Sequence, residues 1–131
     1  MPINALDTSE LSAHFDRYKA KLHRYTEEDA KQWAEGLIKF RETDVIVTPV
    51  FIELIAAAQN AHQLKMYRAY LSKFRRFDKG RILPTDWEQA ANLAARIPRD
   101  GKPRQLGDCL LLALEKRFNL RFITRDKRFR T

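Results

Sequence analysis

The sequence has little cysteine and no long apolar segment. Cys109 is the single cysteine among 131 residues, so no disulfide can form within the chain, and its apolar surroundings predict a small core residue. The three histidines, His14, His23 and His62, lack the spacing of metal ligands. No apolar run reaches the roughly 18 residues that span a bilayer, and the first residues contain neither a basic leader nor an apolar signal core. We therefore expect a cytoplasmic protein.

The chain is long enough for one hydrophobic core and too short for two comfortable domains. With 131 residues and 44% hydrophobic content, we expect one domain over residues 1–131. The 25 Lys and Arg against 17 Asp and Glu give a formal net charge of +8. This excess favours a polyanion such as nucleic acid, or an acidic protein partner, without choosing between them. The basic residues gather at positions 73–76, 96–104 and 121–130.

Short apolar runs alternate with amphipathic segments along the chain. The apolar runs predict four short strands, at residues 3–6, 45–47, 82–83 and around 122–123. Periodic apolar positions predict helices, including one after residues 7–9 and others at 27–41, 49–60, 61–77, 87–96 and from about 106. This alternation indicates an α/β fold with a central parallel β-sheet of about four strands and helices on both faces.

Capping residues precede several of these helices. The first helix follows three residues whose side-chain oxygens can accept hydrogen bonds from its unpaired N–H groups, namely Asp7, Thr8 and Ser9. Residues 26–29 resemble a capping box, and Thr85 with Glu88 predicts another. Thr48 is placed to act as N-cap directly after the second strand.

Two acids flank the predicted helix and strand of residues 106–129. Asp108 falls in the first turn of the helix, and Asp126 follows the strand. In a parallel sheet the helix N-terminus and the strand's C-terminal end meet at one edge, where open α/β folds keep their sites. Right-handed crossovers bring the other strand ends to the same edge, so Asp7 and Glu53 should join them. The sequence thus predicts four converging acids.

Four clustered carboxylates repel one another unless a cation neutralises them or some bind protons. Oxygen ligands without nearby His or Cys suit Mg²⁺ or Mn²⁺. Such ions polarise a phosphoryl oxygen and activate water for phosphodiester hydrolysis. Glu53 is a single acid among apolar residues. Its presence there is explained if it belongs to this site, or if it is simply exposed on the helix surface. A basic surface around an acidic cleft is the arrangement expected of a nuclease.

Four fragments in series carry a family resemblance: LDTS at 6–9, TPVFIEL at 48–54, GDCLLLAL at 107–114 and FITRDKRF at 122–129. Together they resemble a PIN domain, closest to the VapC-type toxins of bacterial toxin–antitoxin systems. The resemblance implies a metal-dependent endoribonuclease that uses Mg²⁺ or Mn²⁺, forms a homodimer and is inhibited by a cognate antitoxin. It implies that the metal is bound at the positions matching Asp7, Glu53, Asp108 and Asp126, with hydrogen-bonding support from Thr8 and Thr124.

Within this resemblance each residue has an expected role. The three aspartates would bind the metal directly or through water, while Glu53 would bind it or orient the attacking water. Thr8 and Thr124 would fix the orientation of the carboxylates. The candidates for contact with the RNA backbone are Arg125, Lys127 and Arg128, with Arg130 beside them, although ordinary surface charge explains each of them equally well.

Two alternatives to a toxin remain open on the sequence. One is a PIN-type nuclease of RNA processing, or one that acts on DNA. The other is a catalytically silent scaffold that binds RNA or a protein, against which the intact set of acids counts. With the sequence stopping at Thr131, we also expect the sheet edge beside the fourth strand to be open or covered by a partner.

Overall fold

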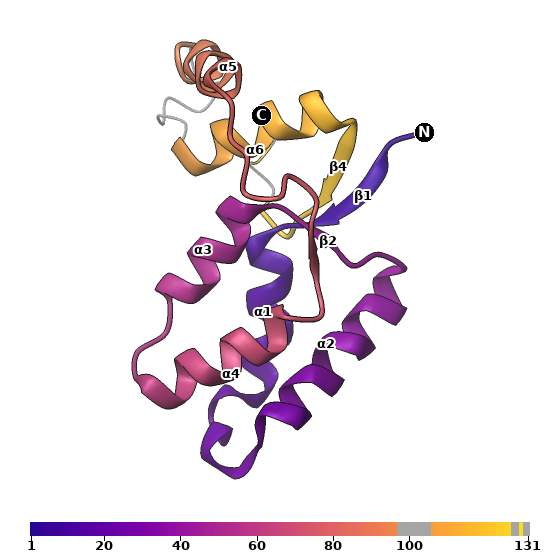
Figure 1. The fold of residues 1–131 in the computed structure, drawn as a ribbon, viewed down its shortest axis with the longest axis vertical. Coiled ribbons are helices and arrows are strands. Elements are labelled where there is room, and N and C mark those ends of the chain that lie inside the picture. Colours follow the sequence, from indigo (N-terminus) through magenta and orange to yellow (C-terminus); the bar gives the residue numbers. More distant parts are fainter. Residues whose placement is uncertain (97–105, 127–128, 130–131) are drawn as a thin grey trace.

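The structure, a computed structural model, describes residues 1–96, 106–126 and 129. Its strands are β1 (Ile3–Leu6), β2 (Val45–Ile46), β3 (Arg75–Arg76) and β4 (Leu120–Ile123). Its helices are α1 (Thr8–Lys19), the 3₁₀ turn η1 (Leu22–Arg24), α2 (Glu27–Arg41), α3 (Thr48–Ala56), α4 (Ala61–Leu71), α5 (Pro84–Ala94) and α6 (Leu106–Phe118). Helices α5 and α6 lie together at one end of the molecule, and α1 to α4 lie on the other side of the strands (Figure 1).

The strands form two parallel pairs, β1 with β4 and β2 with β3. In the first pair Ile3 faces Leu120 and Leu6 faces Ile123. The pairs lie side by side through β1 and β2, and the Thr43 hydroxyl donates to the carbonyl of Asn4 at 2.7 Å. The predicted α/β class with parallel strands is therefore confirmed. The prediction of one sheet of about four strands is wrong for the described residues, because each hydrogen-bonded sheet has two short strands.

The third strand lies elsewhere than predicted. Residues 82–83 precede α5, and β3 is Arg75–Arg76 instead, with both residues exposed. Helix α4 ends at Leu71, short of the predicted residue 77, and the chain then pairs with β2. Backbone bonds hold this pairing, from Arg75 N–H to the Asp44 carbonyl at 2.7 Å and from Phe77 N–H to the Ile46 carbonyl at 2.9 Å. Apolar periodicity missed it because backbone pairing at an edge needs no apolar side chain.

Helix starts were predicted with mixed success. Helix α2 has the predicted bounds, and the capping box of residues 26–29 is present: Asp29 N–H donates to the Thr26 hydroxyl, and Thr26 N–H donates to the Asp29 carboxylate. The predicted box of Thr85 with Glu88 is wrong. The Asp86 carboxylate accepts the Leu83 N–H at 2.8 Å, because the helix begins at Pro84, earlier than expected. Thr48 lies within the first turn of α3, so Val47 is the N-cap.

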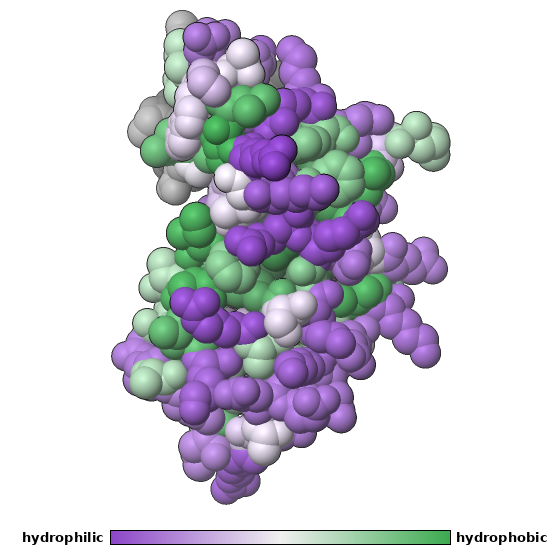
Figure 2. Space-filling model, in the orientation of Figure 1, coloured by the Kyte–Doolittle hydropathy of each residue, from purple (hydrophilic) through white to green (hydrophobic). Residues whose placement is uncertain are grey.

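The core has two parts. The larger part packs α1 to α4 and the strands around aromatic residues, among them Phe15 and Tyr67, whose ring centres lie 4.3 Å apart. The smaller part lies between α5 and α6 and contains Cys109, which is buried as predicted. Figure 2 shows hydrophilic surface over α2 and α4 and apolar surface gathered over α3. None of the described helices is both long and apolar enough to cross a membrane.

Candidate functional site

Asp7 lies where β1 passes into α1. Its N–H donates to the carbonyl of Ile123 at 3.1 Å, which continues the pairing of β1 with β4. The residue is only 6% exposed, and its Oδ2 accepts hydrogen bonds from the hydroxyls of Thr124 at 2.7 Å and Ser9 at 3.2 Å. Asp7 occupies the N-cap position of α1, yet its side chain makes no capping bond there, contrary to expectation. The carboxylate is therefore oriented by side chains from both ends of the chain.

The two hydroxyls that hold Asp7 also hold the segment that carries Asp126. Ser9 Oγ accepts the Arg125 N–H at 2.9 Å, and Thr124 Oγ1 accepts the Asp126 N–H at 3.0 Å. Each hydroxyl has one proton, so both protons can point at Asp7 while both oxygens accept backbone N–H groups. Thr124 therefore hydrogen-bonds both Asp7 and the backbone of Asp126, and its support of a metal site stays a prediction. The sequence did not indicate Ser9 as a site residue. The one feature of the sequence that could have indicated it is its position two residues after Asp7.

Glu53 lies in the second turn of α3 and faces both Asp7 and α6. Partial burial of its carboxyl group raises the pKa of Glu53, although the residue as a whole is exposed to solvent. The negative charge of Asp7 raises this pKa further, and the Thr8 hydroxyl lowers it. A Cβ atom at position 107 would lie 3.3 Å from Glu53 Oε1. Glycine at this position therefore lets the Glu53 carboxylate approach the start of α6.

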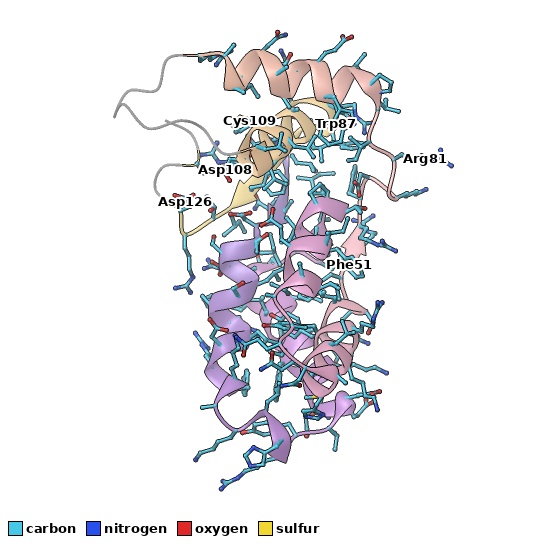
Figure 3. The ribbon with its side chains drawn as sticks, turned by 90° about the vertical axis from the view of Figure 1, so that its left-hand side faces the viewer. Phe51, Arg81, Trp87, Asp108, Cys109 and Asp126 are labelled. Atoms are coloured by element: carbon cyan, nitrogen blue, oxygen red, sulfur yellow. The ribbon has the colours of Figure 1, made fainter. Side chains whose placement is uncertain are left out.

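Asp108 and Asp126 lie on one side of the molecule, as Figure 3 shows. Asp108 is in the first turn of α6 as predicted, and Asp126 follows β4. Among the described residues, no group of three or more His, Cys, Asp or Glu side chains is arranged closely enough to hold one metal ion. The structure links Asp7 to Glu53 and to the backbone of residues 124–126, and it places Glu53 beside the start of α6. A ligand shell shared by all four acids stays a prediction.

The chemistry of the residues present suits a hard divalent cation. The side chains are carboxylates and hydroxyls, the oxygen ligands that Mg²⁺ and Mn²⁺ prefer. The Thr8 hydroxyl is buried, and in the described part of the chain no group meets its Oγ1 with hydrogen-bond geometry. It lies close enough to Glu53 to influence the pKa of that carboxyl. Thr8 therefore lies near Glu53 without a hydrogen bond of good geometry, whereas Thr124 hydrogen-bonds Asp7, and the predicted supporting role of Thr8 stays a prediction.

Glu10 is a buried acid beside this site that the sequence did not single out. Its side chain is 3% exposed, and it accepts from Arg41 Nε at 2.7 Å and from Arg125 Nε at 3.2 Å. Arg41 and Arg125 lie 31 and 115 residues away from Glu10 in the sequence, so no local sequence pattern predicts these contacts. Arg125, a predicted RNA contact, is thus held in place at the site. The other predicted contacts, Lys127, Arg128 and Arg130, lie outside the described residues.

Residues 5–131 match the PIN domain family, nearly the whole chain. No curated protein and no solved structure is similar enough to count as a match. PIN domains have a nuclease-type fold and are generally metal-dependent nucleases. With the match covering the segments that carry Asp7, Glu53, Asp108 and Asp126, the chain belongs to the PIN domain family.

Proposed function

We propose that this protein is a metal-dependent endoribonuclease and the toxin component of a type II toxin–antitoxin system. The observation that carries the proposal is the hydroxyl network in which Ser9 and Thr124 bind Asp7 and also fix the backbone of Asp126. This network joins two acids from opposite ends of the sequence at the carboxyl ends of paired parallel strands. Such an edge is where α/β folds place their sites.

Asp7, Asp108 and Asp126 are the residues that would hold the ion, either Mg²⁺ or Mn²⁺. When bound, the ion polarises a phosphoryl oxygen and lowers the pKa of water. The residues of the chain do the positioning: Ser9 and Thr124 hold the Asp7 carboxylate by two hydrogen bonds, which keeps it from rotating. Glu53, whose pKa is raised, is suited to bind the ion or to orient the attacking water and accept its proton.

Positive charge supports an RNA substrate. The formal net charge of +8 attracts a polyanion, and Arg125 stands directly beside Asp126 with a side chain that is 54% exposed. In this proposal Arg125 would contact a phosphate near the cleaved bond. From the resemblance to VapC-type toxins, we also propose that the protein forms a homodimer, is inhibited by a cognate antitoxin and is located in the cytoplasm.

The first test is cleavage by purified, antitoxin-free protein. A panel of tRNA, rRNA fragments and single-stranded RNA is incubated with Mg²⁺, with Mn²⁺ or with EDTA. Asp108→Asn should abolish cleavage and leave the fold intact, because it removes a ligand charge and little volume. Asp16→Asn, at an exposed position of α1, is the matched control and should cut as the parent does. Cleavage by Asp108→Asn at the parent's rate would refute the assignment.

A second test addresses the biological role. Induced expression in bacteria should arrest growth with the parent sequence and not with Asp108→Asn. If expression of the parent sequence does not arrest growth but the purified protein cleaves RNA in vitro, a nuclease of RNA processing would be favoured. Folded protein that binds no metal by calorimetry and cuts no RNA would favour a silent binding scaffold.

A further inference from the structure

A pocket of about 350 Å³ lies next to the proposed site, between α1 and α2. Its lining includes Glu10, His14 and Arg17 from α1, Gly36 and Phe40 from α2, and Arg125 after β4. Arg125 also belongs to the proposed site, since Ser9 holds its backbone N–H and Asp126 follows it in the chain. The pocket therefore shares Arg125 with the place where RNA would be cut.

The pocket has an excess of positive charge. Among the described residues that line it, Glu10 is the one acid, and Arg17 and Arg125 are two cations. Arg125 meets Glu10 through Nε at 3.2 Å, and Arg41, which is not a lining residue, meets it through Nε at 2.7 Å. Arg17 is exposed. Nε–H is one of five donors on a guanidinium, and 54% of the Arg125 side chain is open to solvent. Arg125 can therefore bind a phosphate while Glu10 holds it in place.

An exposed aromatic ring stands at the same pocket. Phe40 is 73% exposed, and the Arg41 guanidinium carbon lies 5.0 Å from its ring centre. One helical turn earlier, Gly36 is exposed, and nothing lies within 4 Å of where its Cβ would be. The surface of α2 one turn before the ring is therefore open. Exposed rings beside cations are the means by which proteins bind single-stranded nucleic acid, because every base can stack on a ring.

We propose that this pocket is a subsite for one nucleotide that flanks the cleaved bond, with its phosphate on Arg125 and Arg17 and its base on Phe40. The inference rests on the proposed ribonuclease function and extends it. Glu10 is a positioning residue here, since it acts on RNA only through Arg125. Cations and a ring would also suit an acidic protein segment, but the sharing of Arg125 with the site favours the RNA strand.

The test measures binding separately from cleavage. A labelled single strand of eight uridines is titrated by fluorescence anisotropy against protein that carries Asp108→Asn, which leaves the oligonucleotide intact. Adding Phe40→Ala should weaken binding about tenfold through lost stacking, and Phe40→Trp should restore it. Trp87→Ala, which removes a 49% exposed aromatic ring from α5, is the matched control and should bind as the parent does.

The dependence on salt separates the ring from the cations. Arg17→Gln should reduce the slope of log K against log salt by about 0.7, as for one lost phosphate contact on a single strand, while Phe40→Ala should leave the slope unchanged. Equal binding by Phe40→Ala and the parent, or no binding of the oligonucleotide by the parent, would overturn the subsite. A Phe40→Ala variant that loses binding to a polyglutamate peptide and keeps its binding to RNA would also overturn it and point to a protein partner.

The two proposals can fail independently. Tight, Phe40-dependent RNA binding by a protein that never cleaves RNA would keep the subsite and refute the nuclease. RNA cleavage by the parent, together with RNA binding that does not change in Phe40→Ala, would keep the nuclease and refute the subsite.

Discussion

At the scale of single residues, the chemistry of the site depends on which partner each acid has. Asp7 has two hydroxyl donors, Glu53 has the buried Thr8 hydroxyl beside it, and Glu10 has two arginines. Three nearby carboxylates therefore differ in their properties. Asp7 is fixed in orientation by its hydroxyl donors, and Glu10 is neutralised by its arginines and holds Arg125. Burial raises the pKa of Glu53, and the Thr8 hydroxyl partly opposes this shift.

The Thr124 hydroxyl should be needed for cleavage. Thr124→Val keeps the shape of the side chain but removes the donor to Asp7 and the acceptor for Asp126 N–H. We expect cleavage and metal affinity to fall about 10- to 100-fold, the usual effect of losing a residue that orients a metal ligand. Thr124→Ser, which keeps the hydroxyl, should retain most activity. Single-turnover cleavage over a Mn²⁺ titration measures both, and equal losses in the two variants would contradict the role of the hydroxyl.

His14 should make stability depend on pH. Burial lowers the pKa of His14 below its ordinary value of 6.5, the positive charge of Arg17 lowers it further, and Glu10 partly opposes this. The unfolded state then binds a proton more readily than the folded state, so stability is fully present above about pH 6.5 and declines as the pH falls through it. His14 Nδ1 also lies 2.8 Å from the Tyr70 hydroxyl, so a hydrogen bond to Tyr70 holds the ring in its half-buried position.

Urea denaturation at about pH 7.5 and about pH 5.5 measures this effect. His14→Gln should show a smaller loss of unfolding free energy between the two pH values than the parent does. His23→Gln serves as the surface control. The same decline in His14→Gln and in the parent would exclude His14 as the group responsible.

At the scale of elements, α3 is the helix whose placement matters most, since it carries Glu53. Its first residue, Thr48, donates from both N–H and Oγ1 to Asp78 Oδ1, at 3.0 and 2.9 Å. Asp78 is 2% exposed and follows β3, so a segment from across the fold caps the helix. A carboxylate there also complements the positive end of the helix dipole.

Removing this cap should destabilise the protein and loosen α3. Asp78→Ala leaves the Thr48 N–H and hydroxyl without their acceptor, which costs about 1–3 kcal/mol of unfolding free energy. Asp78→Asn keeps an acceptor oxygen and should cost less. Chemical denaturation of the two variants checks this, with Asp44→Ala as a half-exposed control beside the same pair of strands. Losses of equal size at Asp78→Asn and Asp78→Ala would show that the hydrogen bonds are not what matters.

At the scale of the whole molecule, positive charge is spread beyond the site. Exposed basic residues lie in β3 and just after it, namely Arg75, Arg76, Lys79 and Arg81. Figure 3 shows Arg81 on the opposite side of the molecule from Asp108 and Asp126. The net charge of +8 therefore favours contact with polyanions over the molecule generally. In the proposed nuclease, selection of the cleaved bond would come from groups close to the acids, such as Arg125 and the pocket beside it.

The sequence by itself determined what depends on neighbouring residues. Local patterns were enough to predict the bounds of α2, the capping box of residues 26–29 and the position of Asp108 in the first turn of α6. These features follow from periodicity and hydrogen bonds over three or four positions, which any chain with this local sequence would favour. The residue types likewise predict a cation site made of oxygen ligands, because carboxylates without nearby His or Cys suit a hard ion.

Only the tertiary structure decided which distant groups meet. Thr124 and Asp7 are 117 residues apart, and Arg125 and Glu10 are 115 apart, so no local pattern specifies either contact. The cap of α3 by Asp78 and the pairing of β3 with β2 likewise depend on where the chain returns after α4. Parallel pairing of the first and last strands brings residues 7 and 124 together. Packing and backbone pairing act between segments far apart in the sequence. They therefore decided which of the predicted acids lie near one another, because local sequence patterns do not specify such contacts.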